Sequence, residues 1–336
     1  MARSLKTIQF IRKYLNRTKF HFYNWNDAPD DLGVDLITIG SDQVWNPTIV
    51  PPPDYLMKYN PWKIPAIAYS ASIGQHSLDR NWLREYRAGF SRLKAIGVRE
   101  GEAKRLIEKE GFAAEHVVDP TLLVDRNLAW SQFEKKKFTG KKLLVCYFLT
   151  ENFDVLSQVL AGWAERNDAY VQFFFDHPPL GAFPSSRAGI AKWMQYNRLW
   201  RFGRVKGMMS ADPKDFVGAF SSADWIVTNS FHGLMFSVIF KKNVRVVRPS
   251  SAIRRDMSSR IDEFANGVIS GPLMKDSIQD ALTSIDKGED VEFNELEIRS
   301  RREKSREWLL SAIKSAGACS GHGSCSNDER EGLFNQ

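Results

Sequence analysis

Short apolar runs that end in small polar residues alternate with helical patterns along most of this chain. The strands expected from these runs are 35–40, 67–70, 95–99, 116–119, 142–149, 170–175, 224–228 and 244–247. The expected helices are 5–17, 83–93, 100–110, 155–166, 233–240 and a charged helical region within 276–315. Strands that alternate with helices through both halves predict an α/β protein with parallel sheets.

The length of 336 residues exceeds what one compact core usually holds, so we expect two Rossmann-like domains of similar size. The expected N-terminal domain is 1–140 and the expected C-terminal domain is 141–275, with the basic stretch 135–142 as the linker. Helices at 276–316 follow, and the Gly/Ser-rich segment 317–336 is expected to be a disordered tail.

The net charge of +7 and the pI near 9.2 predict a negatively charged partner, such as nucleic acid, anionic lipid or a phosphorylated substrate. Nucleic acid is disfavoured because the cations form no block or binding motif. The pattern of 5–17 places Leu5, Ile8, Ile11 and Leu15 on one helical face. That face indicates either a core-packed helix, which we prefer, or a helix lying on an anionic membrane.

No apolar run of membrane-spanning length and no signal-peptide pattern is present in the sequence. Three cysteines (Cys146, Cys319, Cys325) do not make a disulfide framework, so a reducing cytoplasm is expected, with association at the inner face of the membrane left open. His322 lies between the last two cysteines, but a fourth ligand is not evident. We therefore expect no metal and no cofactor.

Ligands of open parallel sheets bind beyond the carboxyl ends of the strands, which directs attention to three strand ends. The first is Gly40–Asn46, where Asp42, Gln43 and Asn46 suit sugar hydroxyls and Trp45 suits a sugar face. Ser41 is a further candidate for substrate binding, and Ser41 or Asp42 can cap a following helix. A capped turn with a buried tryptophan is an equal alternative. The second strand end is 70–76, where the small Ser72 and Gly74 favour close approach of a ligand and His76 suits acid–base or phosphate contact.

The third strand end, 224–236, is the most informative, because a strand ends at 228–230 and a helix begins near His232. The first turn of a helix binds phosphate or carboxylate through unpaired N–H groups, and Ser230 fits as its N-cap. Arg99, at the end of a strand, and Arg260 are the cations expected to hold an anionic donor.

Six sequence blocks resemble the polysaccharide pyruvyltransferase family. They are GSDQVWN at 40–46, YSASIG at 69–74, VREGEAKRLIEKEG at 98–111, VVDPTLLVDRNLAW at 117–130, VTNSFHGLMFSVIF at 227–240 and SSRIDEF at 258–264. Their order is that of the family, and they cover about 35–264. The resemblance implies a glycosyltransferase-B-like pair of domains with the active site in the cleft between them. It also implies phosphoenolpyruvate as the donor, a glycan or lipid-linked oligosaccharide as the acceptor, and a pyruvate ketal as the product of this step in polysaccharide biosynthesis.

The chain departs from the family pattern in two places. Family members typically open with a strand and an Asn-Tyr-Gly-type loop, whereas this chain opens with a basic helix, which implies an N-terminal domain whose first βα unit is either missing or unrecognisable. Some members carry Arg-Leu-His where this chain has Ser230-Phe231-His232, so donor contacts of that arginine are not carried over.

These residues suggest roles in pyruvyl transfer. His232 is expected to be the general acid or a phosphate contact, Asp42 to accept the hydroxyl proton, and Arg99 and Arg260 to hold the carboxylate and phosphate. Two alternatives stay open. One is a nucleotide-sugar glycosyltransferase of the same architecture, and the other is an inert glycan-binding or assembly partner.

Overall fold

The computed structural model describes residues 2–16, 29–49, 54–135, 140–149, 153–175, 201–208, 211–248 and 260–317. The chain divides into two compact units, each of which is built from separate stretches of sequence. Unit 1 comprises Met1–Arg17, Ala129–Ser258 and Ile269–Phe293. Unit 2 comprises Thr18–Leu128, Ser259–Val268 and Asn294–Gln336.

This division differs from the continuous domains 1–140 and 141–275 expected from the sequence. The chain passes from unit 2 to unit 1 between Leu128 and Ala129, ahead of the basic stretch expected as the linker. The first helix belongs to the unit formed mainly by later residues, and the last helix returns to the unit formed mainly by earlier ones. Packing between distant segments, rather than a linker, sets these boundaries.

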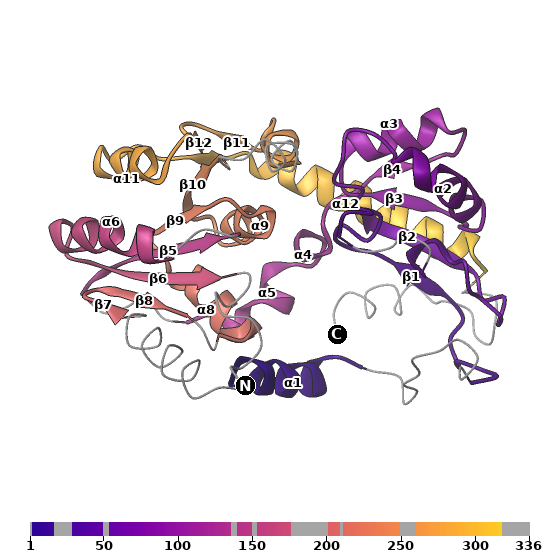
Figure 1. Cartoon of the computed structure of the whole chain (residues 1–336), viewed down its shortest axis with the longest axis horizontal. Helices are drawn as coiled ribbons and strands as arrows, with labels where there is room; N and C mark the ends of the chain where they lie inside the picture. The colour runs from indigo at the N-terminus through magenta and orange to yellow at the C-terminus, as the bar shows by residue number, and fades with distance from the viewer. Residues whose placement is uncertain are drawn as a thin grey trace. The chain divides into compact units, whose positions relative to one another are not determined.

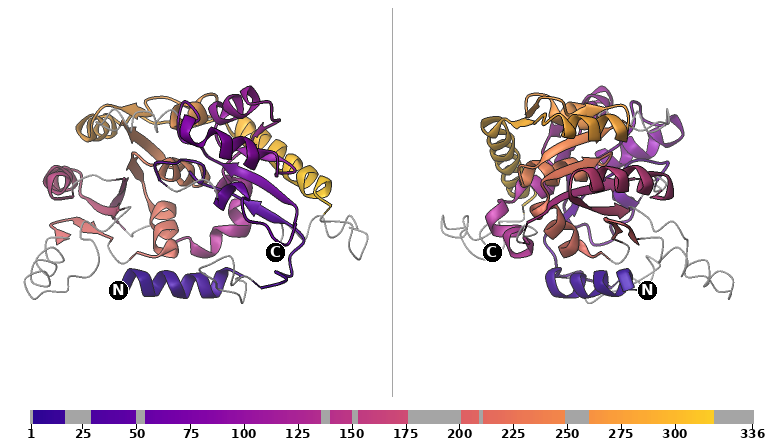
Figure 2. Two further views of the ribbon diagram at one scale, coloured as in Figure 1. Left: turned by 45° about the vertical axis from the view of Figure 1, so that its right-hand side comes forward. Right: turned by 90° about the vertical axis from the view of Figure 1, so that its left-hand side faces the viewer.

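Unit 2 contains a four-stranded parallel sheet in the order of the sequence. Its strands are β1 (Ile37–Ile39), β2 (Ala66–Ala71), β3 (Ile96–Val98) and β4 (Glu115–His116). Successive side chains of β2 are buried on opposite faces. Ala68 packs with α2 (Leu83–Phe90) and α3 (Gly101–Lys109), whereas Ile67 packs against α12 (Glu295–Ser315). Figure 2 shows α12, in yellow, beside this sheet. The expected parallel α/β arrangement is confirmed for this unit.

Unit 1 contains a seven-stranded sheet, parallel except for one edge hairpin. In sheet order its strands are β12 (Met274–Lys275), β10 (Asn243–Val247), β9 (Trp225–Thr228), β5 (Lys142–Phe148), β6 (Ala169–Phe175), β8 (Val205–Gly207) and β7 (Arg201–Phe202). Its longer helices besides the N-terminal one are α6 (Phe153–Arg166), α8 (Pro213–Ser222), α9 (Phe231–Ile239) and α11 (Ile278–Asp286). The sequence analysis missed the β7–β8 hairpin and α8. The two strands of this hairpin, β7 and β8, are two and three residues long, which is too short for a periodic pattern.

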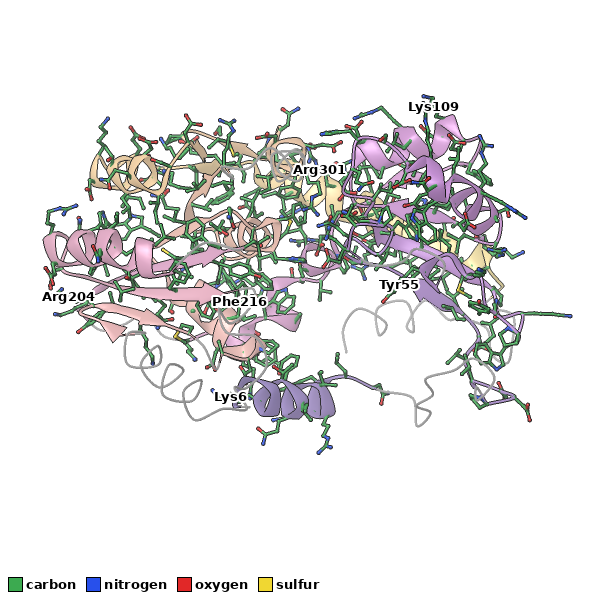
Figure 3. All side chains as sticks on the ribbon, viewed as in Figure 1. Lys6, Tyr55, Lys109, Arg204, Phe216 and Arg301 are labelled. Carbon is green, nitrogen blue, oxygen red and sulfur yellow. The ribbon has the colours of Figure 1, made fainter. Side chains whose placement is uncertain are left out.

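Helices cover both faces of the unit 1 sheet (Figure 1). On one face, α6 and α11 bury side chains such as Trp163 and Leu282 against β5, β6 and β9. On the other face, Phe216 of α8, labelled in Figure 3, contacts Phe174 of β6 and Phe236 of α9. This sandwich of helices and parallel strands confirms the Rossmann-like layering expected for unit 1.

The N-terminal helix α1 (Ala2–Tyr14) forms as expected, but the packing predicted for its apolar face is only partly found, since Ile11 is half-buried. Ile8 and Leu15 are 43% and 55% exposed. The rings of Phe10 and Tyr14 instead contact Phe133, because aromatic rings bury more apolar area than these aliphatic side chains. Lys6 and Lys135 both pair with Asp215 of α8, at 3.0 and 3.2 Å.

Shorter elements complete the described chain. They are η2 (Asp54–Leu56), η3 (Arg80–Trp82), α4 (Pro120–Leu123), α5 (Arg126–Ala129), η4 (Ser131–Phe133), β11 (Ile269–Ser270) and β13 (Glu292–Phe293). Cys146 is buried, and burial raises the pKa of its thiol. Cys319, His322 and Cys325 lie outside the described residues. None of the helices that the structure describes has the length and apolarity needed to cross a bilayer.

Candidate active site

The four strands of unit 2 all end in polar residues at the same edge of the sheet, because parallel strands share their carboxyl edge. Asp42 follows β1, Ser72 follows β2, Arg99 and Glu100 follow β3, and Asp119 follows β4. Hydrogen bonds and ion pairs connect these side chains. We refer to this group, with Arg260, as the carboxyl-edge cluster.

Arg99 lies at the centre of the carboxyl-edge cluster, with a side chain that is 1% exposed. Its guanidinium lies 3.3 Å from Asp42 Oδ1, 3.3 Å from Asp119 Oδ2 and 3.5 Å from Glu100 Oε1. Burial alone lowers the pKa of Arg99, but the three carboxylates together raise it above the usual arginine value. The cation is therefore fixed and neutralised by the protein itself.

This geometry corrects the expectation that Arg99 holds the carboxylate or phosphate of a substrate. A side chain that is 1% exposed and already contacts three carboxylates has no face for a further anion. Arg99 instead joins β1, β3 and the residues after β4, and it holds Asp42 in place.

Glu100 and Arg260 form a second buried part of the cluster. The Ser72 hydroxyl donates to Glu100 Oε1, and Arg260 Nη1 lies 3.9 Å from the same oxygen. Burial, and then the charge of Arg99, lowers the pKa of Arg260 to about 10, so its guanidinium stays charged at neutral pH. The other oxygen, Glu100 Oε2, is buried without a hydrogen-bond partner among the described residues. Ser72 is fully buried, so it organises this interior rather than receiving a ligand.

Asp42 presents the exposed carboxylate of the cluster, with a side chain that is 66% exposed. Its φ is +72°, a left-handed conformation that aspartate tolerates better than most residues. The backbone is held there because Asp42 O accepts from Ser72 N at 2.9 Å, while Asp42 N donates to Ser41 Oγ at 2.8 Å. Ser41 Oγ in turn donates to Asp119 Oδ2 at 3.4 Å. A carboxylate fixed in an unusual backbone conformation at a strand end is typical of functional sites.

Gly40 is required for this turn. A Cβ at this position would lie 2.1 Å from the backbone oxygen of Tyr69 on the neighbouring strand, and φ is +128°. Only glycine allows β1 to leave the sheet so close to β2.

Trp45 and Gln43 are buried, which corrects their expected contact with sugars. Trp45 is 0% exposed, its indole N–H donates to Tyr55 O at 2.9 Å, and its ring packs on Phe90. Gln43 is 8% exposed, and its Oε1 accepts from Asn46 Nδ2 at 2.7 Å. Both side chains therefore fold the 40–46 turn around an apolar core, as in the capped-turn alternative.

The loop after β2 places two further candidate residues. Gly74 has φ +61°, and a Cβ there would lie 2.2 Å from Gln43 Oε1, so glycine serves the packing of the two loops. His76 is exposed, and its Nδ1 lies 3.3 Å from Glu102 Oε2. Its proposed contact with substrate stays a prediction.

The second candidate region lies in unit 1, where β9 meets α9. Ser230 is the N-cap of α9 as expected, and its Oγ accepts from Gly233 N at 3.4 Å. Thr228 Oγ1 donates to Tyr147 O at 2.6 Å and accepts from Ser230 N at 3.0 Å. His232 lies half-buried in the first turn of this fixed helix start, against the ring of Phe231.

Sequence reasoning missed Glu100 and Asp119 as site residues. Glu100 is the second residue after β3 and Asp119 the third after β4, so the strand-end position that selected Arg99 was available for both. Asp119 is also the N-cap of α4, since its Oδ1 accepts from Thr121 N at 2.9 Å. In the part of the chain that the structure describes, no three His, Cys, Asp or Glu residues are placed to hold a metal ion.

Comparison with known families identifies the chain. The family model described as "Polysaccharide pyruvyl transferase" matches residues 3–251, well over half of the 336 residues. The chain belongs to the polysaccharide pyruvyl transferase family. The matched range contains Asp42, Arg99 and His232, so both candidate regions lie within the part of the chain that the family model matches. No curated protein matches the chain.

Solved structures with weak similarity to the chain include two UDP-GlcNAc 2-epimerases and a MurG. The epimerase from Methanocaldococcus jannaschii, in complex with UDP-GlcNAc and UDP, is 14% identical, with a TM-score of 0.47 over 82% of this chain and 76% of that chain. The Neisseria meningitidis epimerase, bound to UDP-GlcNAc, is 13% identical, with a TM-score of 0.46 over 80% and 69%. Acinetobacter baumannii MurG is 10% identical, with a TM-score of 0.38 over 90% and 74%. The fold assignment rests on the sheet topology of the two units.

Proposed function

We propose that this family member transfers the pyruvyl group of phosphoenolpyruvate to two hydroxyls of a sugar and forms a ketal. The observation that carries the proposal is the family match over residues 3–251. An exposed carboxylate at the carboxyl edge of one sheet and a histidine at a capped helix start on the other sheet support it.

The reaction needs an acid, a base and a site for phosphate. Protonation of the methylene carbon of phosphoenolpyruvate leaves positive charge on the adjacent carbon, which a sugar hydroxyl attacks while it gives up its proton. The C–O bond to phosphate then breaks, and a second hydroxyl closes the ketal. Its proton leaves with the phosphate, so one pyruvate ketal and one hydrogen phosphate are formed.

Asp42 is proposed as the group that accepts the proton of the attacking hydroxyl. Its carboxylate is 66% exposed, and the buried Arg99 lies 3.3 Å from one of its oxygens and fixes its direction. A general base works only when it is held within hydrogen-bond reach of the proton, and the rigid pairing supplies that position. In this proposal Arg99 is a positioning residue.

His232 is proposed as the general acid or as the contact of the leaving phosphate. It lies in the first turn of α9, where the helix dipole favours negative charge. The hydrogen bonds of Thr228 and Ser230 fix this helix start relative to β9 and β5. Both roles require the imidazole to meet the phosphate side of the donor.

The experiment is acceptor-dependent phosphate release from phosphoenolpyruvate, with mass spectrometry of the acceptor. We expect the gain of one pyruvyl ketal. His232→Ala and Asp42→Asn are each expected to lower turnover roughly 10²–10⁴-fold. Asp35→Asn is the matched control, because Asp35 is an exposed aspartate of the same unit.

Three outcomes would contradict parts of the proposal. Full turnover in Asp42→Asn or His232→Ala removes that residue from the mechanism. Absence of phosphate release across galactose-, glucose- and mannose-containing acceptors, together with no calorimetric binding of phosphoenolpyruvate, contradicts the reaction itself. Tight binding of a nucleotide sugar without any response to phosphoenolpyruvate would favour glycosyl transfer.

A further inference from the structure

A pocket of about 350 Å³ lies between η2 and α2 of unit 2 and shares no residue with the carboxyl-edge cluster. It is lined by Leu56, Lys58, Arg84, Glu85, Ala88 and Arg92. Residues four apart share one face of a helix, so Arg84 and Ala88 form a wall along α2, and Arg92 extends it from the turn that follows the helix. The volume lies at the lower end of the range of ligand sites.

The pocket is strongly positive, since three cations face one carboxylate. Within the described residues, Lys58, Arg84 and Arg92 make no ion pair with a carboxylate. Arg87, on another face of the same helix, shows the contrast, because its guanidinium lies 2.6 Å from Glu110. A concave surface with uncompensated cations concentrates positive potential and attracts anions.

The walls of the pocket are rigid. A Cβ on Gly89 of α2 would lie 2.5 Å from Leu56 Cβ, so η2 packs directly on the helix backbone. The indole of the buried Trp45 donates to Tyr55 O and fixes η2 from the other side. Arg92 Nη1 donates to Leu56 O at 3.4 Å, which joins the two walls. A preformed site avoids the entropy cost of ordering on binding.

Two exposed tyrosines flank the lining segment. Tyr55 precedes Leu56 and is 43% exposed, and Tyr59 follows Lys58 and is 44% exposed. Lys58 Nζ lies 5.7 Å from the ring centroid of Tyr59. An aromatic ring offers an apolar face and a polar tip, which match the C–H face and the hydroxyls of a sugar. The neighbouring guanidinium groups match the oxygens of a phosphate or carboxylate.

We propose that this pocket binds the acidic group of an anionic oligosaccharide, with Tyr55 and Tyr59 against its sugar rings. Phosphate and carboxylate share the required chemistry. The assignment of this oligosaccharide as part of the acceptor rests on the proposed function, whereas binding itself does not depend on pyruvyl transfer. The pocket would then select acidic over neutral glycans.

The test is calorimetry of the full chain with four probes: an oligogalacturonate, a phosphorylated mannan oligosaccharide, a neutral malto-oligosaccharide and inorganic phosphate. We expect the acidic oligosaccharides to bind and the neutral one to bind at least about tenfold more weakly. The preferred acidic probe identifies the source of the charge as carboxylate or phosphate. Binding of the neutral probe as tight as that of both acidic probes would overturn the proposal.

Substitutions inside and outside the pocket test whether the acidic oligosaccharides bind there. The double variant Lys58→Gln with Arg84→Gln is expected to lose about tenfold or more of the affinity for acidic oligosaccharides. Lys94→Gln with Lys109→Gln removes the same charge outside the pocket and is expected to leave affinity nearly unchanged. Figure 3 shows Lys109 on α3, away from Tyr55. Equal losses in both double variants would mean general electrostatic attraction and refute the site.

Tyr55→Ala separates sugar recognition from anion binding. We expect weaker binding of acidic oligosaccharides and unchanged binding of inorganic phosphate. Equal effects on both would refute the role of the ring. Phosphate release from phosphoenolpyruvate tests the reaction separately, so failure of the pocket and failure of the proposed function give different results.

Discussion

Replacement of Arg99 by methionine tests whether the carboxyl-edge cluster stabilises unit 2. The change keeps an unbranched apolar side chain in the place of the arginine stem but leaves Glu100 and Asp119, whose side chains are 5% and 1% exposed, without the central cation. Removal of one partner from a buried pair costs about 3–5 kcal/mol. Asp119 keeps hydrogen bonds from Thr121 and Ser41, so we expect the lower end, about 3 kcal/mol.

Hydrogen exchange of the amides of β2 and β3 measures this cost, because it reports the opening free energy of unit 2 itself. Arg87→Met is the matched control. Its ion pair with Glu110 has an arginine side chain that is 58% exposed, so its loss should cost about 0.2–1 kcal/mol. Addition of Asp119→Asn to Arg99→Met should restore part of the stability, since the 1% exposed Asp119 side chain is then neutral, whereas Glu100 keeps Arg260 at 3.9 Å.

Two results would refute this reasoning. If Arg99→Met costs no more than Arg87→Met, the cluster does not hold the sheet edge together. If Asp119→Asn brings no recovery in the Arg99→Met background, the cost does not come from the buried carboxylate of Asp119. Turnover of a stable Arg99→Met variant then shows whether the position of Asp42 depends on the guanidinium.

Two further predictions concern single residues of the fold. Gly40→Ala should lower the melting temperature far more than Gly33→Ala: both have positive φ, but the new Cβ meets Tyr69 O at 2.1 Å in the first and nothing within 4 Å in the second. Similar melting temperatures would contradict the close approach. Although burial raises the pKa of Asp215, hydrogen bonds from its two lysine partners hold it below 3.8. The stability advantage of the native chain over Asp215→Asn should therefore be full above about pH 4 and shrink as the pH falls through the folded pKa, which urea unfolding against pH would show. An advantage that grows in acid would contradict this.

The positions of the site residues along the chain could be predicted from the sequence, but the directions of their side chains could not. Ser41, Ser72 and Arg99 were selected because each follows a buried strand, and the structure places all three at one sheet edge. The inward direction of Arg99 depends on Asp42 and Asp119, which come from other strands. A local sequence pattern does not indicate which residues of other strands a side chain will pair with.

The division of the chain into two units could also not be predicted from local sequence patterns. Trp308, Leu309 and Ile313 are apolar residues within the expected charged helical region, but nothing near them in the sequence indicates what they pack against. That partner is the Ile67 face of β2, far earlier in the chain. Rings from Phe10 and Tyr14 likewise pack on Phe133.

The late return of α12 to unit 2 has a consequence for the growing polypeptide. Ribosomes add roughly 5–20 residues per second, so β2 emerges well before α12, and its Ile67 face stays uncovered while nearly all of unit 1 is made. The rings of Phe10 and Tyr14 in α1 likewise stay uncovered until Phe133 has been made. Neither core is complete until α11 and α12 have been made, and until then the nascent chain exposes apolar surface to chaperones and to neighbouring chains.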